Sequence, residues 1–474
     1  MKKVFACAGM FVLLLAITLA AQFYLDSLPE EKKVKKEEKG TVSNYIVPDA
    51  DYLSFYELET FETHLPVVHI NTDGAQIMKE NKVWASLAVA EAPLDGSMRS
   101  ITEEPDYEEA IQINYRGASS FSQFDKKQYR VKFFKKEGGT KDKEASFLGM
   151  GKHSEWVLNG PFLDKTLMRN RLVYEIGREI NEWAPDSRYV ELFVNGEYQG
   201  VYLAIEPVTN GEARLRLCEF GLASGECAYI VKRDRVETEE SPLDVYGHYA
   251  GKTFNDLFID YPSKSNLTEP QKAWITKDID DFERVLYGEY FDDPQQGYAK
   301  YIDVDAFVDY VVLNEFVLNH DAGNLSMYVY KELGGKLKPV IWDYNNAFDN
   351  YQWFAMDYKQ FYLTRNSWFD RLLQDRAFVD KVVKRYRELR ENTLSEEKLF
   401  ADIDAYKEEL GDATERNFKI WGYTFHEDLM SGDNTLHYDA ESYEEAIVQL
   451  KGAIHARGTF MDEHIEDLYA NCVN

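Results

Sequence analysis

The chain has 474 residues, of which 45% are hydrophobic and 29% are charged, a composition typical of a globular protein with a large core. Its formal net charge of −29 argues against a nucleic-acid-binding surface, because a phosphate backbone is bound by Lys and Arg. Aromatic residues make up 14% of the chain, which fits either a Tyr-rich core or a surface on which sugars stack.

The N-terminus carries the clearest non-globular feature. Two lysines are followed by the uncharged run Val4–Leu25, which is long enough to span a bilayer and long for the apolar core of a cleaved signal. We therefore predict a signal anchor or signal peptide over residues 1–25 and a charged tether over residues 26–64. Lysines flank the run on both sides, so charge does not fix its orientation. We expect the rest of the chain to lie outside the cytoplasmic membrane.

Residues 65–210 are predicted to form strands and one long helix. The segments EAIQINYRG and QYRVKFF alternate apolar and polar residues as half-buried strands do. A helical pattern begins after Asp164, a predicted N-cap, and stops at Pro185. The dipeptide Asn195-Gly196 separates two further strands and predicts a tight hairpin.

Within the section 211–365, we predict the strand AYIVKRD from about Ala228, followed by a long acidic, mostly helical region. An apolar run with helical periodicity, FVDYVVLNEFVLNHD, then leads to Asp321. Residues 366–474 are predicted to be mainly helical. Cys218 and Cys227 bracket a short loop with two glycines, so we also predict a disulfide between them.

A β-hairpin with its turn at Gly334-Gly335 is predicted next. With a two-residue turn, Ser326 lies opposite Asp343, and Asn324 lies opposite Asn345. Antiparallel pairing then gathers Asp321, Asn324 and Asp343 at one edge of the sheet. That arrangement suits the binding of a cation, or the movement of a proton beside one.

Four motifs, in order along the chain, resemble the CotH family of bacterial spore-coat and surface proteins. They are YRGASSFSQFDKKQYRVKFF, FLGMGKHSEWVLNGPFLDKTLMRNRLVYEIGREI, RYVELFVNGEYQGVYLAIE and KLKPVIWDYNNAF. The likeness covers most of the chain, from about residue 65 onward. It implies an α+β, two-lobed atypical protein-kinase-like fold with a helical C-terminal part. It also implies binding of ATP with Mg²⁺ or Mn²⁺, and serines of coat proteins as substrates.

The resemblance also implies roles for the residues around the hairpin. In kinases a catalytic Asp and an Asn precede a hairpin, and a metal-binding Asp follows it. Asp321 then corresponds to the catalytic residue, and Asp343 with Asn324 to the metal ligands. Ser326 is an alternative to Asn324.

Further nucleotide-binding residues are implied in the first part of the chain. Lys132 alternates with two apolar residues in its strand and is expected to face the ATP phosphates, with Glu175 as a possible partner. The alternative is a basic residue on an exposed edge strand. Arg116, with the neighbouring Gly117 and Ser119, is expected in a phosphate-facing turn, and Glu206 beside the adenine.

Two positions depart from the family pattern. Ala118 stands where the Arg-Gly motif usually continues with Asn, and Asn345 replaces the second Asp of the metal motif. The loss of a carboxylate would weaken metal binding or favour a different ion.

Three functions therefore stay open. The first is an exported, membrane-tethered kinase acting on Ser-rich surface or spore-coat proteins. The second is a non-catalytic surface or coat scaffold with the same fold. The third is a glycoside hydrolase that uses Asp321 and Asp343 as its carboxylate pair.

Overall fold

The computed structural model describes residues 61–101, 103–236, 241–350, 356–425 and 440–473. The predicted anchor, residues 1–25, and nearly all of the predicted tether lie outside these ranges. Within the described ranges, no helix combines the length and the apolar character that crossing a membrane requires. The chain is an α+β protein with a helical C-terminal part, as predicted.

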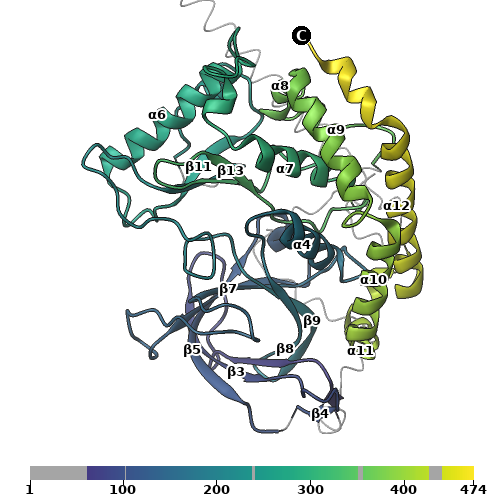
Figure 1. Cartoon of the computed structure of the whole chain (residues 1–474). Coiled ribbons are helices and arrows are strands. Elements are labelled where there is room, and N and C mark those ends of the chain that lie inside the picture. Colours follow the sequence, from purple (N-terminus) through teal and green to yellow (C-terminus); the bar gives the residue numbers. More distant parts are fainter. Residues whose placement is uncertain (1–60, 102, 237–240, 351–355, 426–439, 474) are drawn as a thin grey trace, which may run out of the picture. The chain divides into compact units, whose positions relative to one another are not determined.

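Seven strands of the first part close into a barrel, drawn in the lower half of Figure 1. Neighbouring strands are antiparallel, except that β2 and β8 close the barrel in parallel. Alternate apolar residues of each strand point inward, so Ile111 and Phe133 are fully buried. The strands, in spatial order, are β2 (Val67–Asn71), β3 (Val83–Ala90), β5 (Tyr107–Arg116), β6 (Gln128–Phe134), β7 (Glu155–Asn159), β9 (Glu197–Ile205) and β8 (Ser187–Val194).

The local predictions for this part are largely confirmed. Asn195 and Gly196 form the turn between β8 and β9, with φ values of 53° and 82° that are typical of a type I′ hairpin. The long helix is α4 (Arg169–Ile180), so the prediction of Asp164 as its N-cap is wrong. The Asp164 carboxylate instead accepts hydrogen bonds from the backbone N and Nη1 of Arg169, at 2.8 and 2.6 Å, and orders the loop that precedes the helix.

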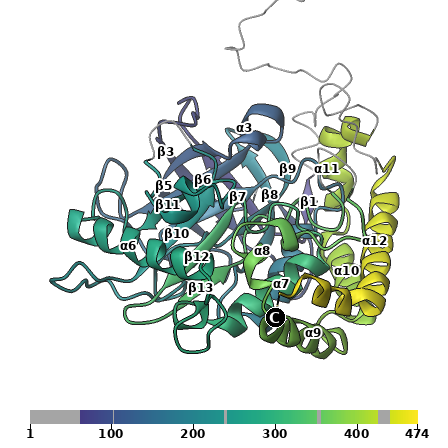
Figure 2. The same cartoon turned by 90° about the horizontal axis from the view of Figure 1, so that it is seen from above.

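A second, four-stranded antiparallel sheet contains the predicted hairpin. Its strands, in spatial order, are β11 (Asp256–Tyr261), β10 (Tyr229–Asp234), β12 (Met327–Lys331) and β13 (Leu337–Val340). Figure 2 shows α6 (Glu269–Leu286) to the left of this sheet and α7 (Val304–Phe316) to its right. The strand β11 was not predicted, because it lies in the region expected to be mostly helical.

The hairpin exists, but its predicted register is wrong by one residue. Tyr328 pairs with Val340 and Lys331 with Leu337, so five residues rather than two connect the strands. The cause is Glu332, whose carboxylate accepts from the amides of Leu333 (2.7 Å) and Cys218 (3.0 Å) and so ends the strand early.

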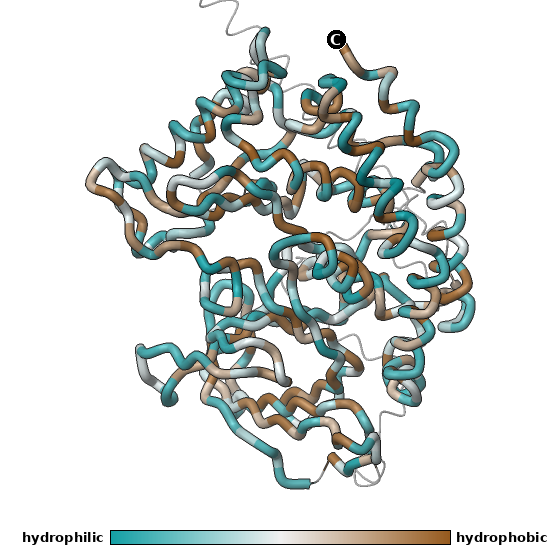
Figure 3. Tube along the Cα trace, viewed as in Figure 1, coloured by the Kyte–Doolittle hydropathy of each residue, from teal (hydrophilic) through white to brown (hydrophobic). Residues whose placement is uncertain are grey.

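Helices form most of the remainder. Figure 3 shows hydrophobic residues concentrated in the barrel strands and along α7, which is apolar on nearly all sides and therefore buried. In Figure 1, α9, α10 and α12 lie along the right side of the molecule, and α11 packs against β9. The remaining elements are β1 (Glu62–Thr63), β4 (Arg99–Ser100), α3 (Ser119–Gln123), α5 (Tyr246–Tyr249), α8 (Phe369–Leu372), α9 (Arg376–Arg390), α10 (Glu396–Leu410), α11 (Ala413–Trp421) and α12 (Tyr443–His464), with short 3-10 turns at Tyr298–Lys300, Leu363–Arg365, Gly422–Phe425 and Ile465–Asn471.

The predicted disulfide is absent from the structure, where both Cys218 and Cys227 are free. Cys227 is buried in the main hydrophobic core. The Cys218 Sγ instead lies 3.6 Å from the carbonyl oxygen of Phe220. The loop is therefore held by packing and hydrogen bonds.

Candidate functional site

Asp321 lies in a tight loop between α7 and β12. The apolar helix ends at Phe316, and Leu318 adopts a φ of 53°, so Asp321 follows the helix instead of ending it as predicted. The carbonyl oxygen of Asp321 accepts from the amide of Asn324 at 3.0 Å. Its carboxylate is 22% exposed and accepts a hydrogen bond from Nδ2 of Asn346 at 3.1 Å. The loop thus presents an oriented carboxylate to solvent.

Asp343 directly follows the hairpin and has a strained backbone. Its φ of 67° is rare for a residue with a side chain, and such strain is concentrated at functional sites. The carboxylate accepts from Oγ of Ser326 at 3.2 Å, and the backbone N donates to the hydroxyl of Tyr174 at 3.3 Å. Ser326 and Asp343 therefore meet, although the register differs from the prediction.

The charges around Asp343 show which groups lie close to it. Burial raises the pKa of the Asp343 carboxyl, nearby Arg116 opposes this shift, and the Asp321 carboxylate adds to it. The two aspartates at the open end of the hairpin therefore repel each other. The structure thus brings Asp321 and Asp343 to the same end of the hairpin, as the sequence predicted, and also places Arg116 near Asp343. The catalytic, metal-binding and phosphate-binding roles of these residues stay predictions.

Asn324 lies in the same loop, but its amide oxygen faces another group. It accepts from the backbone N of Ser367 at 3.3 Å and from its Oγ at 3.0 Å. Because a backbone N–H only donates, the atom on this side of the amide is the oxygen. The role of Asn324 as a metal ligand stays a prediction, and it would require this oxygen to leave Ser367.

In the turn after β5, side chains from neighbouring strands pack closely against the backbone. The Arg116 guanidinium donates to Oε1 of Gln128 at 2.6 Å and lies 5.5 Å from the ring centre of Trp342. Gly117 has a φ of 93°, and a Cβ there would lie 2.0 Å from Oγ of Ser120. Ser119 accepts from Nη1 of Arg235, the residue that follows β10, at 3.2 Å. The predicted phosphate-facing turn therefore lies against the second sheet.

Lys132 does not contact Glu175, so the predicted partner is wrong. The Lys132 Nζ lies 2.8 Å from Asp142 and 3.3 Å from Glu155, its cross-strand neighbour on β7. Glu175 lies on α4, 4.0 Å from Nε of Arg178. Partner choice here follows strand pairing, which places Glu155 beside the lysine on the same face of the barrel.

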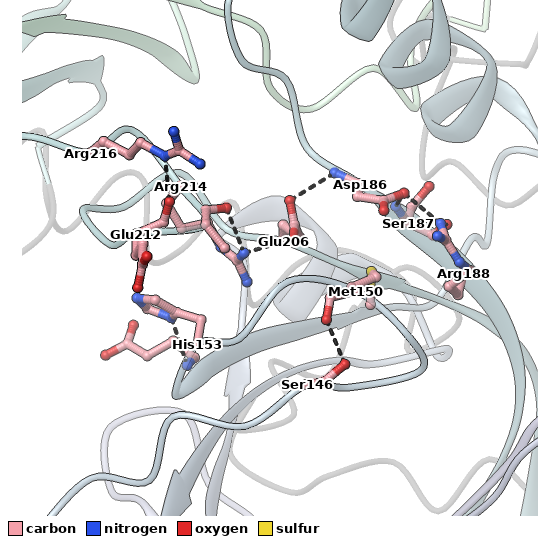
Figure 4. A network of polar contacts seen from close by, with 12 residues as sticks. Ser146, Met150, His153, Asp186, Ser187, Arg188, Glu206, Glu212, Arg214 and Arg216 are labelled. Atoms are coloured by element: carbon pink, nitrogen blue, oxygen red, sulfur yellow. Dashed lines mark hydrogen bonds and ion pairs between the residues drawn. The ribbon is translucent and has the colours of Figure 1, made fainter.

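Glu206 belongs to a network of hydrogen bonds and an ion pair, shown in Figure 4. Its two carboxylate oxygens accept from Nη1 of Arg214 at 2.6 Å and from the backbone N of Asp186 at 3.1 Å. Burial raises the pKa of Glu206, and the Arg214 guanidinium opposes that shift. Arg214 is itself stacked 4.8 Å from the ring centre of Trp156. The adenine-binding role of Glu206 stays a prediction that these contacts do not favour.

Sequence reasoning missed two charged residues beside the site. Asp234 ends β10 next to the hairpin, and burial raises its pKa, with the Asp343 carboxylate adding to the shift. Arg130 lies on β6 and, with Arg116, opposes the burial-driven rise in the pKa of Tyr328 on β12. Strand-end position gave a signal for Asp234, but only the packing of barrel against sheet reveals Arg130. Among the residues that the structure describes, no group of three or more His, Cys, Asp or Glu is arranged to hold a metal ion.

Comparisons with known proteins agree with the sequence resemblance. Residues 113–461 match a family model described as CotH kinase protein. The inner spore coat protein H of Bacillus subtilis strain 168 is 27% identical over 237 residues, which is 50% of this chain and 58% of that relative. The matched region thus spans less than two thirds of the relative's length.

Proposed function

Because the chain belongs to the CotH kinase protein family, we propose that it transfers phosphate from ATP to serine hydroxyls of surface or spore-coat proteins in a metal-dependent reaction. The observation that carries the proposal is the placement of two aspartates at the open end of the hairpin. Asp343 has a φ of 67° and accepts from Ser326, and the Asp321 carboxylate accepts from Asn346, three residues after Asp343. In this proposal the barrel serves as the N-lobe and the four-stranded sheet with its helices as the C-lobe of an atypical kinase fold.

The residues present fit a divalent cation. Asp343 is half-buried, and burial with the nearby Asp321 carboxylate raises its pKa against the opposing Arg116. A cation would relieve this excess of negative charge, and Mg²⁺ or Mn²⁺ is well served by one or two carboxylates with phosphate oxygens and water. Asp343 would hold the metal, together with Asn324 or Ser326. When bound, the metal would neutralise charge on the ATP phosphates.

The protein's own residues then supply positioning and proton transfer. Asp321 accepts the proton of the acceptor hydroxyl, for which its partly exposed carboxylate, oriented by Asn346, is suited. Arg116 and Arg130 provide positive charge on the barrel side of the site. Preorganised charge of this kind is the main catalytic contribution that phosphoryl transfer requires from a protein.

Calorimetry with ATP, with and without Mg²⁺ or Mn²⁺, tests the proposal. Asp343→Asn should remove a full ligand charge and weaken metal-dependent ATP binding. Asp321→Asn should leave that binding intact and abolish labelling of the protein itself or of a Ser-rich substrate, because its role arises only in the transition state. Asp404→Asn, an exposed residue on α10, is the matched control. Thermal melting establishes that each variant is folded.

A non-catalytic scaffold is the second candidate, and Asn345 favours it. Asn345 stands at the position where the family usually has a second carboxylate, and its side-chain amide donates to Oδ1 of Asn346 at 2.9 Å. The absence of nucleotide binding by well-folded wild-type protein would support the scaffold. ATP binding that Asp343→Asn leaves unchanged would refute the metal assignment alone.

The name of the Bacillus subtilis relative describes an inner spore coat protein. We propose a coat-associated or cell-surface location for this chain, with Val4–Leu25 as its membrane anchor. Protease added to intact cells or protoplasts should then remove the described part of the chain. Protection that lasts until lysis would reverse this topology.

A further inference from the structure

The loop of Asp321 is held by side chains from distant parts of the chain. Each donates a hydrogen bond to an oxygen of the next three residues, and together they leave the loop little freedom to shift. The bonds run from Arg233 Nη1 to Gly323 O (3.1 Å), from Asn366 Nδ2 to Ala322 O (2.7 Å) and from Asn255 Nδ2 to Asn324 O (2.9 Å).

The Arg233 guanidinium is the most unusual of these donors, because it is fully buried. Its Cζ lies 4.2 Å from the ring centre of Trp368, and Nη2 lies 3.5 Å from Oε1 of Glu283, which is also fully buried. Glu283 in turn accepts from Nε1 of Trp368 at 2.8 Å and from the backbone N of Gly247 at 2.6 Å. Stacking and pairing therefore fix the plane of the guanidinium under the loop.

Stability alone does not account for such an arrangement. Burying an ion pair costs desolvation energy, and well-packed apolar residues of similar volume are often as stable. The guanidinium provides what an apolar residue cannot, a directed donor to the Gly323 carbonyl. Gly323 itself has a φ of 80°, and a Cβ there would lie 2.9 Å from Cδ2 of Phe369. The loop backbone is therefore also packed tightly against Phe369.

We propose that Arg233 and Asn366 are positioning residues for phosphoryl transfer. They hold the backbone of residues 321–324 so that the Asp321 carboxylate stays within hydrogen-bond reach of the acceptor hydroxyl. Neither residue touches substrate. This inference rests on the proposed function. A displacement of about 1 Å at a reacting group lowers a catalysed rate by roughly a hundredfold. Hydrogen bonds that hold the Asp321 loop in place therefore protect the rate of transfer.

Three variants separate positioning from general stability. Asn366→Ala removes the donor to Ala322, and Arg233→Met removes the donor to Gly323. Arg416→Met is the matched control, since Arg416 pairs with fully buried Glu191 and lies 4.9 Å from the ring centre of Phe61, away from the loop. Asn366→Ala and Arg233→Met should lower kcat at least tenfold and change KM for ATP less than twofold. Arg416→Met should lose stability without this loss of kcat.

Hydrogen exchange provides a readout that does not require activity. The amides of Asn324 and Leu325 donate to the Asp321 carbonyl oxygen at 3.0 and 2.8 Å. Their exchange should accelerate at least tenfold in Asn366→Ala while the amides of β12 are unchanged, even if the wild-type protein proves to be a scaffold. Equal exchange at these two amides in Asn366→Ala and wild type would overturn the proposal. So would an equal loss of kcat in Arg416→Met.

Discussion

Lys126 allows a direct test of how burial affects a charged side chain, because this lysine is fully buried. Its Nζ donates to the carbonyl oxygen of Val201 on β9 and to Oδ1 of Asn417 on α11, each at 2.7 Å. No ion pair with a carboxylate is found for Lys126 among the residues described. A neutral amine has two N–H groups, which these two acceptors satisfy, and burial lowers the pKa of Lys126 well below its usual value.

The consequence is a pH-dependent free energy of unfolding. Between the lowered pKa of the folded state and the ordinary lysine pKa of about 10.4, the unfolded chain binds one more proton than the folded chain. Stability must therefore rise with pH in this window, by up to about 1.4 kcal/mol per pH unit, and level off above it. From pH 8 to pH 10, the wild type should gain up to about 2.7 kcal/mol relative to Lys126→Met, which has no proton to bind.

Urea unfolding of both proteins at several pH values measures this difference. Lys451→Met, which removes a lysine that lies 2.6 Å from Asp404 near the surface, controls for the general effect of pH on a charged protein. Its profile should run parallel to that of the wild type. The reasoning fails if the Lys126→Met and wild-type profiles are parallel between pH 8 and pH 10.

In urea unfolding, Gly117→Ala should destabilise the protein by about 1–3 kcal/mol, because the alanine must adopt a positive φ and its Cβ collides with Ser120. The double variant Gly117→Ala/Ser120→Ala should recover only the part of this loss that is due to the collision. Arg214→Met should cost about 3–5 kcal/mol because it leaves the Glu206 carboxylate buried without its cation. Adding Glu206→Gln should restore part of that loss in the same assay, and no recovery would contradict the ion-pair argument. Because burial and a nearby carboxylate raise the pKa of Asp343, Mg²⁺-ATP affinity should fall when calorimetry is repeated at pH 5.5 instead of pH 7, and equal affinities would count against Asp343 as the ligand.

The sequence predicted those features that depend on neighbouring residues. The Asn195-Gly196 turn is correct because its conformation is chosen by the two residues themselves. The strands on either side of Gly334-Gly335 are also correct, but their register depends on a bond from the distant Cys218 amide to Glu332. No local pattern contains that information.

Long-range packing also decided the parts of the site that the sequence missed. Lys132 pairs with Glu155 because β6 and β7 are neighbours in the barrel, whereas the expected partner Glu175 lies on a helix. Arg233 occupies an ordinary alternating position in its strand, and only the complete fold shows that Trp368 and Glu283 enclose it. The placement of Asp321 and Asp343 at one end of the hairpin was predictable because the two residues flank it in sequence, whereas their catalytic and metal-binding roles stay predictions.

The parallel closure of the barrel has a consequence for how the chain folds during synthesis. Strand β2 pairs with β8, and the Thr63 hydroxyl beside β2 donates to Glu191, 128 residues further along. One edge of β2 therefore stays without its partner until β8 has left the ribosome. Unpaired strand edges invite pairing with other chains, and contacts so distant in sequence form slowly. We expect premature release of chains that end before β8 to yield aggregates, and binding of a chaperone to β2 during this interval to improve the yield of folded protein.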